Sequence, residues 1–189
     1  MKNKLLIITG LLLIIVALCL TIINIKNNEK AERESKIIVK EISEKISKRI
    51  TEKNIEEKTA KNTIIQIDNE DYIGLIKIEK INLILPIIDN WDYQKLAKGP
   101  CRYSGNIDSK LIVCAHNYPS QFGELKKLDE GDIIEITDIN GIIHKYKVEK
   151  KENIYYKNIE EMKNTDSDLT LFTCTVGGKA RFTIRCQKI

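Results

Sequence analysis

Cys174 has the surroundings that a nucleophilic cysteine requires. It ends the apolar segment 170–174 (TLFTC) and is followed at once by a glycine-containing loop. A strand that ends at a loop keeps its backbone rigid while the last side chain reaches a groove. A free thiol with a pKa of about 8.5 is mostly protonated at neutral pH, so a nucleophilic cysteine needs a neighbouring base. The alternative for a cysteine taken alone is a small buried hydrophobic residue.

His116 is the candidate for this base. It follows the apolar segment 111–115 (LIVCA) and begins a loop, so the same strand-end argument places it at the rim of the domain. The other histidine, His144, lies in a polar segment just after a turn, where we expect a surface side chain. Without a nearby cysteine, His116 would be interpreted as a structural histidine.

Arg181 supplies a positive charge near the cysteine. It opens an apolar segment seven residues after Cys174, and a hairpin between the two would place both at one rim. A guanidinium there can donate to a peptide carbonyl or stabilise the charge that develops on its oxygen. Arg185 shares the strand face but lies about 13 Å further along. Position favours Arg181, and Arg185 stays as the alternative.

The other four cysteines have no regular spacing; they are Cys19, Cys101, Cys114 and Cys186. Without a Cys-x-x-Cys pair, a structural zinc site is not expected. Cys114 and His116 would share a strand face, and a metal site completed by Cys174 or Cys186 is a disfavoured alternative. One disulfide among Cys101, Cys114 and Cys186 is compatible with an extracellular domain, and the sequence selects no pairing.

An uncharged apolar segment of 21 residues covers positions 5–25. A helix needs about 20 apolar residues to cross the hydrocarbon core of a bilayer. No small-residue cleavage pattern follows, so we expect a retained membrane anchor in residues 1–25 rather than a cleaved signal peptide. Counting basic residues alone places the C-terminal side in the cytoplasm, but this is weak evidence for a large domain.

Residues 26–70 are predicted to form a charged stalk, helical or flexible. Ile38, Ile42, Ile46 and Ile50 recur every four residues in a segment without glycine or proline. This spacing gives a narrow apolar stripe on a helix. We interpret the stalk as a spacer. A coiled-coil dimer, or a regulatory helix laid on the domain, is the disfavoured alternative because the stripe is only about three to four turns long.

Residues 71–189 are predicted to form a mainly β domain. Strands are expected at 72–79, 81–88, 111–116, 133–137, 143–149, 169–174 and 181–186, and short helical turns at 93–97, 121–128 and 159–162. The pair Asn140-Gly141 predicts a hairpin turn, and Pro86 predicts a strand edge or bend. Short strands with few helices favour a closed barrel or a sandwich.

The amino-acid composition excludes several classes of protein. With 42% hydrophobic and 31% charged residues, the chain is neither disordered throughout nor a polytopic membrane protein. A formal net charge of +4 is too small to indicate a nucleic-acid partner.

Together these features resemble the sortases, the membrane-anchored cysteine transpeptidases of Gram-positive bacteria. The family's Thr-Leu-x-Thr-Cys motif matches 170–174, its histidine matches His116, and its arginine after the cysteine loop matches Arg181. The segment 99–105 is similar to the glycine- and tyrosine-containing segment that precedes the histidine strand in many sortases. The resemblance covers about residues 71–189.

The resemblance implies an eight-stranded β-barrel and a two-step reaction. Cys174 would attack the threonine carbonyl of an LPxTG-like sorting signal, and an amine of a peptidoglycan precursor or a pilin lysine would resolve the thioester. His116 would act as general acid and then as base, and Arg181 would stabilise the oxyanion. No metal or organic cofactor is needed for this chemistry.

The implied partners are surface proteins with a C-terminal sorting signal, the amine acceptor, and the bilayer around residues 5–25. The N-terminus would be cytoplasmic and the catalytic domain extracellular. No aspartate-aromatic lid motif is evident, since the stretch 68–72 is a poor substitute. The acids Glu124, Asp129, Glu130 and Asp132 are interpreted as a solvated loop rather than a calcium site.

The subclass stays open, with a class D-like or another non-pilus class in view. Two alternatives in function also stay open. One is a surface thiol hydrolase, in which water resolves the acyl-enzyme. The other is a non-catalytic, membrane-tethered barrel that binds peptides.

Overall fold

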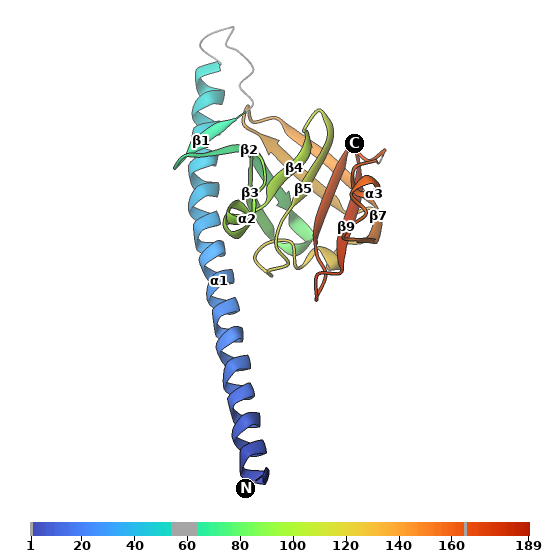
Figure 1. The fold of residues 1–189 in the computed structure, drawn as a ribbon. Helices are drawn as coiled ribbons and strands as arrows, with labels where there is room; N and C mark the ends of the chain where they lie inside the picture. Colours follow the sequence, from blue (N-terminus) through green and yellow to red (C-terminus); the bar gives the residue numbers. More distant parts are fainter. Residues whose placement is uncertain (1, 54–63, 165) are drawn as a thin grey trace.

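The computed structural model describes residues 2–53, 64–164 and 166–189. It consists of one long helix and a β-barrel. Helix α1 (Lys2–Lys53) passes along one side of the barrel and continues well beyond it toward the N-terminus (Figure 1). The segment 54–63, which the predicted stalk includes, lies outside the described residues.

Eight strands close into the barrel. The strands of the described chain are β1 (Ile65–Ile67), β2 (Glu70–Ile78), β3 (Leu83–Ile88), β4 (Cys101–Asn106), β5 (Ser109–Cys114), β6 (Ile133–Asp138), β7 (Ile143–Tyr155), β8 (Leu169–Cys174) and β9 (Ala180–Lys188). Their order is β1-β2-β3-β4-β5-β8-β9-β7-β6, and β2 pairs again with β6. The ring therefore runs from β2 to β9, while β1 adds only to the start of β2. The predicted eight-stranded barrel is confirmed.

Short helices connect the strands. They are η1 (Glu79–Ile81), α2 (Tyr93–Lys98), η2 (Leu125–Lys127) and α3 (Ile159–Lys163). Three of them lie where helical turns were predicted, and η1 lies between two predicted strands, where no helix was expected. The Asp92 side chain caps α2 by accepting a hydrogen bond of 2.7 Å from the Lys95 N–H. The Asn140-Gly141 turn is also confirmed, and Gly141 has the positive φ of 82° that such a turn requires.

Aliphatic side chains from every side of the ring fill the barrel interior. The fully buried members include Ile76, Ile87, Val113, Leu171 and Ile184. Buried and outward positions alternate along β6, as expected for a strand with one face on the core. Pro86 lies in β3, which pairs with β2 along its length but with β4 only at Ile88. The predicted edge position of this proline is confirmed.

The spacer interpretation of the stalk is wrong for its helical part. Ile42 is fully buried and Ile46 is 6% exposed, and both pack in a cluster with Ile65, Ile67 and Tyr72. This part of α1 instead packs on the barrel, as in the alternative of a helix laid on the domain. The stripe was correctly located, but its apolar partner comes from the barrel.

The N-terminal part of α1 has no such cover. It is long and apolar enough to cross a membrane. Its aliphatic side chains are exposed, as Leu12 (59%) and Ile15 (50%) illustrate. Exposed aliphatic side chains over this length suit a hydrocarbon environment.

Candidate functional site

His116, Cys174 and Arg181 line one pocket of about 270 Å³. Two strand pairings bring them together. Strands β5 and β8 run parallel, so their C-terminal ends lie at the same rim of the barrel. There the Ala115 N–H donates to the Phe172 carbonyl (3.2 Å), and the Thr173 hydroxyl donates to the Ala115 carbonyl (2.9 Å). These bonds hold the residue before His116 beside the strand that ends in Cys174.

The β8–β9 hairpin places Arg181 next to the thiol. Cys174 and Arg181 are direct partners in its antiparallel ladder, and facing residues project from the same side of a sheet. The turn between them uses Gly177 and Gly178, which have φ values of 79° and 71°. The Arg181 guanidinium turns back on this loop and donates to the carbonyls of Gly178 (3.2 Å) and Ala180 (3.3 Å).

The side chain of Arg185, the alternative to Arg181, forms its contacts outside the pocket. It is 5% exposed and forms an ion pair with Glu152 (2.8 Å). Its remaining donors bond the Thr170 hydroxyl (3.0 Å) and the carbonyls of Glu161 (2.8 Å) and Met162 (3.0 Å) in α3. Arg185 therefore anchors α3 to the barrel, and Arg181 is the arginine that lines the pocket.

Backbone contacts fix the position of His116. Its N–H donates to the buried Gln121 side-chain oxygen (2.9 Å), and its carbonyl accepts from the Phe122 N–H (3.1 Å). The imidazole lies against the Tyr118 ring, with 5.0 Å between ring centroids. Burial lowers the pKa of His116 from its ordinary value of 6.5. The imidazole is therefore neutral at neutral pH and able to accept a proton.

Apolar and aromatic side chains form the pocket walls. They include Trp91, Tyr93, Leu96, Tyr103, Tyr155, Ile159, Met162 and Phe172. Tyr103 contacts Phe172 edge-on at 5.3 Å and Trp91 at 5.5 Å between ring centroids. No aspartate or glutamate is among the described residues that line this pocket. Sequence reasoning missed these wall residues, because they come from separate segments that the fold brings together.

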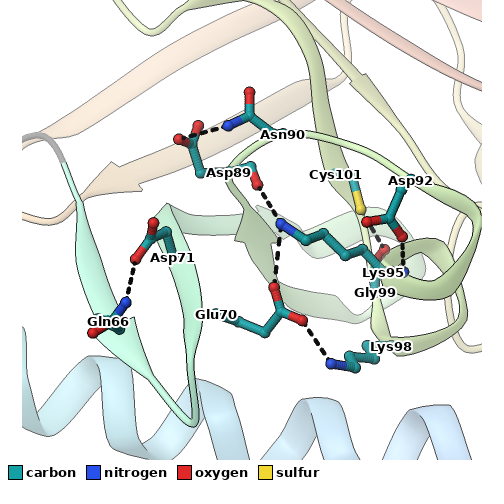
Figure 2. Close-up of polar contacts among 10 residues, drawn as sticks. All are labelled: Gln66, Glu70, Asp71, Asp89, Asn90, Asp92, Lys95, Lys98, Gly99 and Cys101. Atoms are coloured by element: carbon teal, nitrogen blue, oxygen red, sulfur yellow. Dashed lines mark hydrogen bonds and ion pairs between the residues drawn. The ribbon is translucent and has the colours of Figure 1, made fainter.

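Two lysines of α2 tie one wall of the pocket to the barrel. Lys98 and Lys95 reach the Glu70 carboxylate of β2 at 2.6 and 3.3 Å, and Lys95 also donates to the Asp89 carbonyl at 3.4 Å (Figure 2). Burial alone would raise the pKa of Glu70, but its contacts with Lys98 and Lys95 outweigh this and hold the pKa below 4.5. The α2 carbonyl of Leu96 in turn accepts from the Gln121 amide (3.4 Å), which holds the His116 backbone.

All five cysteines are free thiols. Cys101 and Cys114 face each other across β4 and β5 and are buried. Burial raises the pKa of Cys114 to about 12 and also raises the pKa values of Cys101 and Cys186. Cys174 is the barrel thiol that is not fully buried. No group in the described chain brings together three His, Cys, Asp or Glu residues for a metal, so the cysteine–histidine metal alternative finds no support.

Three further predictions concerned polar residues outside the pocket: the acidic loop after His116, His144 and the stretch 68–72. Asp129 and Asp132 form ion pairs with Lys80 at 2.6 and 2.7 Å. The surface prediction for His144 is wrong, since its side chain is only 10% exposed and lies 3.5 Å from the Asp138 carboxylate. The stretch 68–72 forms the β1–β2 turn and the start of β2, away from the pocket lining.

Comparisons with known proteins agree with this architecture. A family model for the Sortase domain matches residues 76–189. A Clostridium perfringens Sortase D5 transpeptidase has a similar structure, with a TM-score of 0.63 and 22% identity over 83% of this chain and 99% of that chain. SortaseC1 from Streptococcus suis has a TM-score of 0.55 and 27% identity over 62% of this chain and 73% of that chain.

A third similar structure contains a peptide motif. It is the X-ray structure of Clostridium perfringens sortase C with the C-terminal cell wall sorting motif. Its TM-score is 0.57, with 23% identity over 85% of this chain and 94% of that chain. A search of curated proteins found no match.

Proposed function

The chain belongs to the sortase family, and on this premise we propose that it is a membrane-anchored cysteine transpeptidase with Cys174 as its nucleophile. The observation that carries the proposal is that His116, Cys174 and Arg181 line one pocket. The apolar N-terminal part of helix α1 is its membrane anchor, with the N-terminus cytoplasmic and the barrel outside.

The first step forms a thioester. The Cys174 thiol gives its proton to His116 as the sulfur attacks the threonine carbonyl of an LPxTG-like sorting signal, and the peptide bond after the threonine breaks. His116 gives the leaving amine its proton. In the second step an acceptor amine attacks the thioester, and His116 takes a proton from the amine and passes it to the Cys174 sulfur, which leaves as a thiol. The acceptor is the amine of a peptidoglycan precursor or a pilin lysine.

Arg181 stabilises the negative charge on the carbonyl oxygen in both steps. A guanidinium has five N–H donors, and the contacts with Gly178 and Ala180 use one of its terminal nitrogens. The other donors are left for the substrate. A donor aimed at the developing oxyanion lowers the barrier more than one aimed at the ground-state carbonyl.

The walls of the pocket support a substrate with uncharged side chains. Its lining combines aromatic and aliphatic residues with His116 and Arg181, and it contains no described carboxylate. The leucine and proline of an LPxTG-like signal would bury apolar surface here, which contributes roughly 25 cal/mol per Å². The similar sortase C structure with a sorting motif also supports this substrate class.

The test is to incubate the full chain with a panel of candidate sorting peptides and to follow the protein by mass spectrometry. We expect an acyl adduct on Cys174 and, with a primary amine present, an amine-linked product. Cys174→Ala and His116→Ala are expected to abolish both. Cys19→Ala is the matched control, because this cysteine lies in the apolar part of α1, and should keep full turnover.

Three outcomes separate the alternatives. Normal turnover by Cys174→Ala would refute the assigned nucleophile. Hydrolysed peptide as the sole product in the presence of several amines would indicate a thiol hydrolase. A Cys174 that neither forms an adduct nor reacts with a mild alkylating reagent would indicate a non-catalytic peptide-binding barrel.

A further inference from the structure

The loop that carries His116 is bonded to helix α1. The Ser120 N–H donates to the Asn28 side-chain oxygen (3.1 Å). The Ser120 hydroxyl contacts the Asn28 side-chain oxygen (2.8 Å) and its carbonyl (3.3 Å). Ser120 follows His116 by four residues in the loop after β5. The helix therefore touches the barrel at the end where the pocket residues His116 and Cys174 lie.

This contact lies close to the end of the membrane-spanning segment. Asn28 follows Ile25, the last residue of the apolar segment, by three positions. At a rise of 1.5 Å per residue, this is about 5 Å along the helix axis. Because α1 is continuous across this junction, the height of the His116 loop above the bilayer follows from the helix itself.

Further contacts prevent the barrel from pivoting on Asn28. Ala31 is 2% exposed and Ile42 is fully buried against the barrel. Ser35 donates to the Lys98 carbonyl at 3.2 Å. The hairpin at the opposite end of the barrel lies against Ile50, since a Cβ on Gly141 would meet its side chain at 2.5 Å. The helix thus holds the barrel along its whole height.

The two ends of the barrel lie at different distances from the membrane segment. The loop after β5 and the β8–β9 turn are both at the end that faces the N-terminal part of α1 (Figure 1). Val176, in that turn, is 95% exposed. The β6–β7 turn packs near Ile50, which is 25 residues beyond Ile25. That separation corresponds to about 38 Å along the helix.

We propose that the end of the barrel that carries the pocket rests on the lipid surface. The β8–β9 turn then lies in the headgroup region, and the loop after β5, which carries His116, lies just above the headgroups. This inference rests on the proposed function, because it requires α1 to span a bilayer. An exposed valine beside two glycines and Lys179 suits this boundary, where aliphatic groups enter the acyl region and lysines stay among the headgroups. The pocket then receives its substrate at the membrane surface.

Tryptophan quenching in vesicles tests the position of the turn. The full chain in a Trp91→Phe background has no other tryptophan, so single probes can be introduced. They are Val176→Trp in the turn, Ile15→Trp in the anchor and Ile142→Trp near the opposite end. With lipids brominated near the headgroup, we expect severalfold stronger quenching at position 176 than at position 142. Position 15 is the midpoint of the anchor, so lipids brominated near the ends of the acyl chains should quench it. Circular dichroism confirms that each variant is folded.

A matched insertion tests whether the helix sets this height. Seven helix-forming residues between Lys26 and Asn27 lift the barrel by about 10.5 Å and nearly preserve the helix face. The insertion should reduce quenching at position 176 to the level at position 142 and leave position 15 unchanged. Activity is measured in the chain that keeps Trp91. There the insertion should slow cleavage of a vesicle-tethered sorting peptide but leave cleavage of the free peptide unchanged.

Each contrary result has a distinct meaning. Quenching at position 15 without quenching at position 176 would overturn the inference and leave the membrane anchor in place. Quenching at position 176 that persists after the insertion would also overturn the inference, because the length of the helix would then not set the distance of the barrel from the bilayer. If neither position is quenched, the anchor and the inference both fail, while adduct formation on Cys174 with a free peptide still reports the proposed chemistry.

Discussion

Cys174 and Arg181 are direct partners across the β8–β9 ladder, the last pair before the hairpin turn. Arg185 is paired with Thr170 further along the same two strands. Both arginines project from the same strand face, since they are four residues apart. Their surroundings, rather than their face, therefore determine which of them can reach the pocket.

Arg181→Ala is expected to lower kcat/KM for sorting-peptide cleavage by about 10²- to 10³-fold, the usual effect of losing one oxyanion donor. The denaturation midpoint should stay unchanged, because the Arg181 guanidinium bonds only carbonyls of its own loop among the contacts described. Steady-state kinetics and urea denaturation on the same preparation measure both effects. A large stability loss with normal turnover per folded molecule would contradict the assigned role.

Arg185→Met is the contrasting variant. It removes the donors that hold the carbonyls of α3 and one of the two cations at the Glu152 carboxylate, which keeps its ion pair with Lys150 at 2.6 Å. The loss of hydrogen bonds from a charged donor costs about 1.5–3 kcal/mol. We expect a lower free energy of unfolding in urea, and a smaller loss of kcat/KM than for Arg181→Ala, because Arg185 acts on the pocket only through the α3 residues that line it. Unchanged stability would show that this network does not hold α3.

The pH dependence of catalysis should reflect the buried position of His116. Burial lowers the pKa of this residue from 6.5, so the imidazole becomes protonated only at a pH below that value. We expect the acidic limb of the kcat/KM profile to lie below pH 6.5, since this parameter reports the free enzyme. His116→Asn should abolish the limb together with most of the activity. An acidic limb above pH 6.5 would contradict the burial argument.

Seven of the strands, together with His116, Cys174 and Arg181 in the pocket, were predictable because their signals are local; β1, β4 and the pocket walls were not predicted. The Asn140-Gly141 turn has its own conformational preference, and one hairpin with a short turn places Arg181 opposite Cys174. The burial of His144 was not predictable in this way. It depends on the β6–β7 register, which pairs His144 with Ile136 and brings it beside Asp138.

The docking of α1 could not be predicted for a related reason. An apolar stripe shows that a helix buries one face, but it does not identify the partner. Here the partner is formed by Ile65, Ile67 and Tyr72, which follow the helix in the sequence and meet it only in the folded chain. The aromatic pocket wall has the same origin, since Trp91 and Tyr103 belong to different elements.

Ile42→Ala tests this docked helix. Ile42 is fully buried between α1 and the barrel, and truncating a buried isoleucine to alanine costs about 2–5 kcal/mol. Ile37→Ala is the matched control, because this side chain is 66% exposed on the same helix. We expect a lower free energy of unfolding for the first variant and little change for the second. Equal stability of the two variants would show that the helix does not pack on the barrel in solution.

Glu70 links the stability of the α2 wall to pH. Its contacts with Lys98 and Lys95 hold its pKa below 4.5 despite the opposing effect of burial. A carboxylate whose folded pKa is depressed contributes stability above its unfolded pKa and loses it as the pH falls through the folded value. Glu70→Gln should therefore lower the free energy of unfolding by about 1–2 kcal/mol at pH 7.

The difference between the wild type and Glu70→Gln should shrink progressively below pH 4.5, because the protonated wild-type carboxyl loses the same ion pairs that the glutamine lacks. Urea denaturation between pH 7 and pH 3 measures this change. Glu79→Gln is the control, since its carboxylate is 88% exposed and lies 3.7 Å from Lys77, and exposed pairs contribute little. A difference for Glu70→Gln that stays constant down to pH 3 would show that the charge of Glu70 does not hold α2 in place.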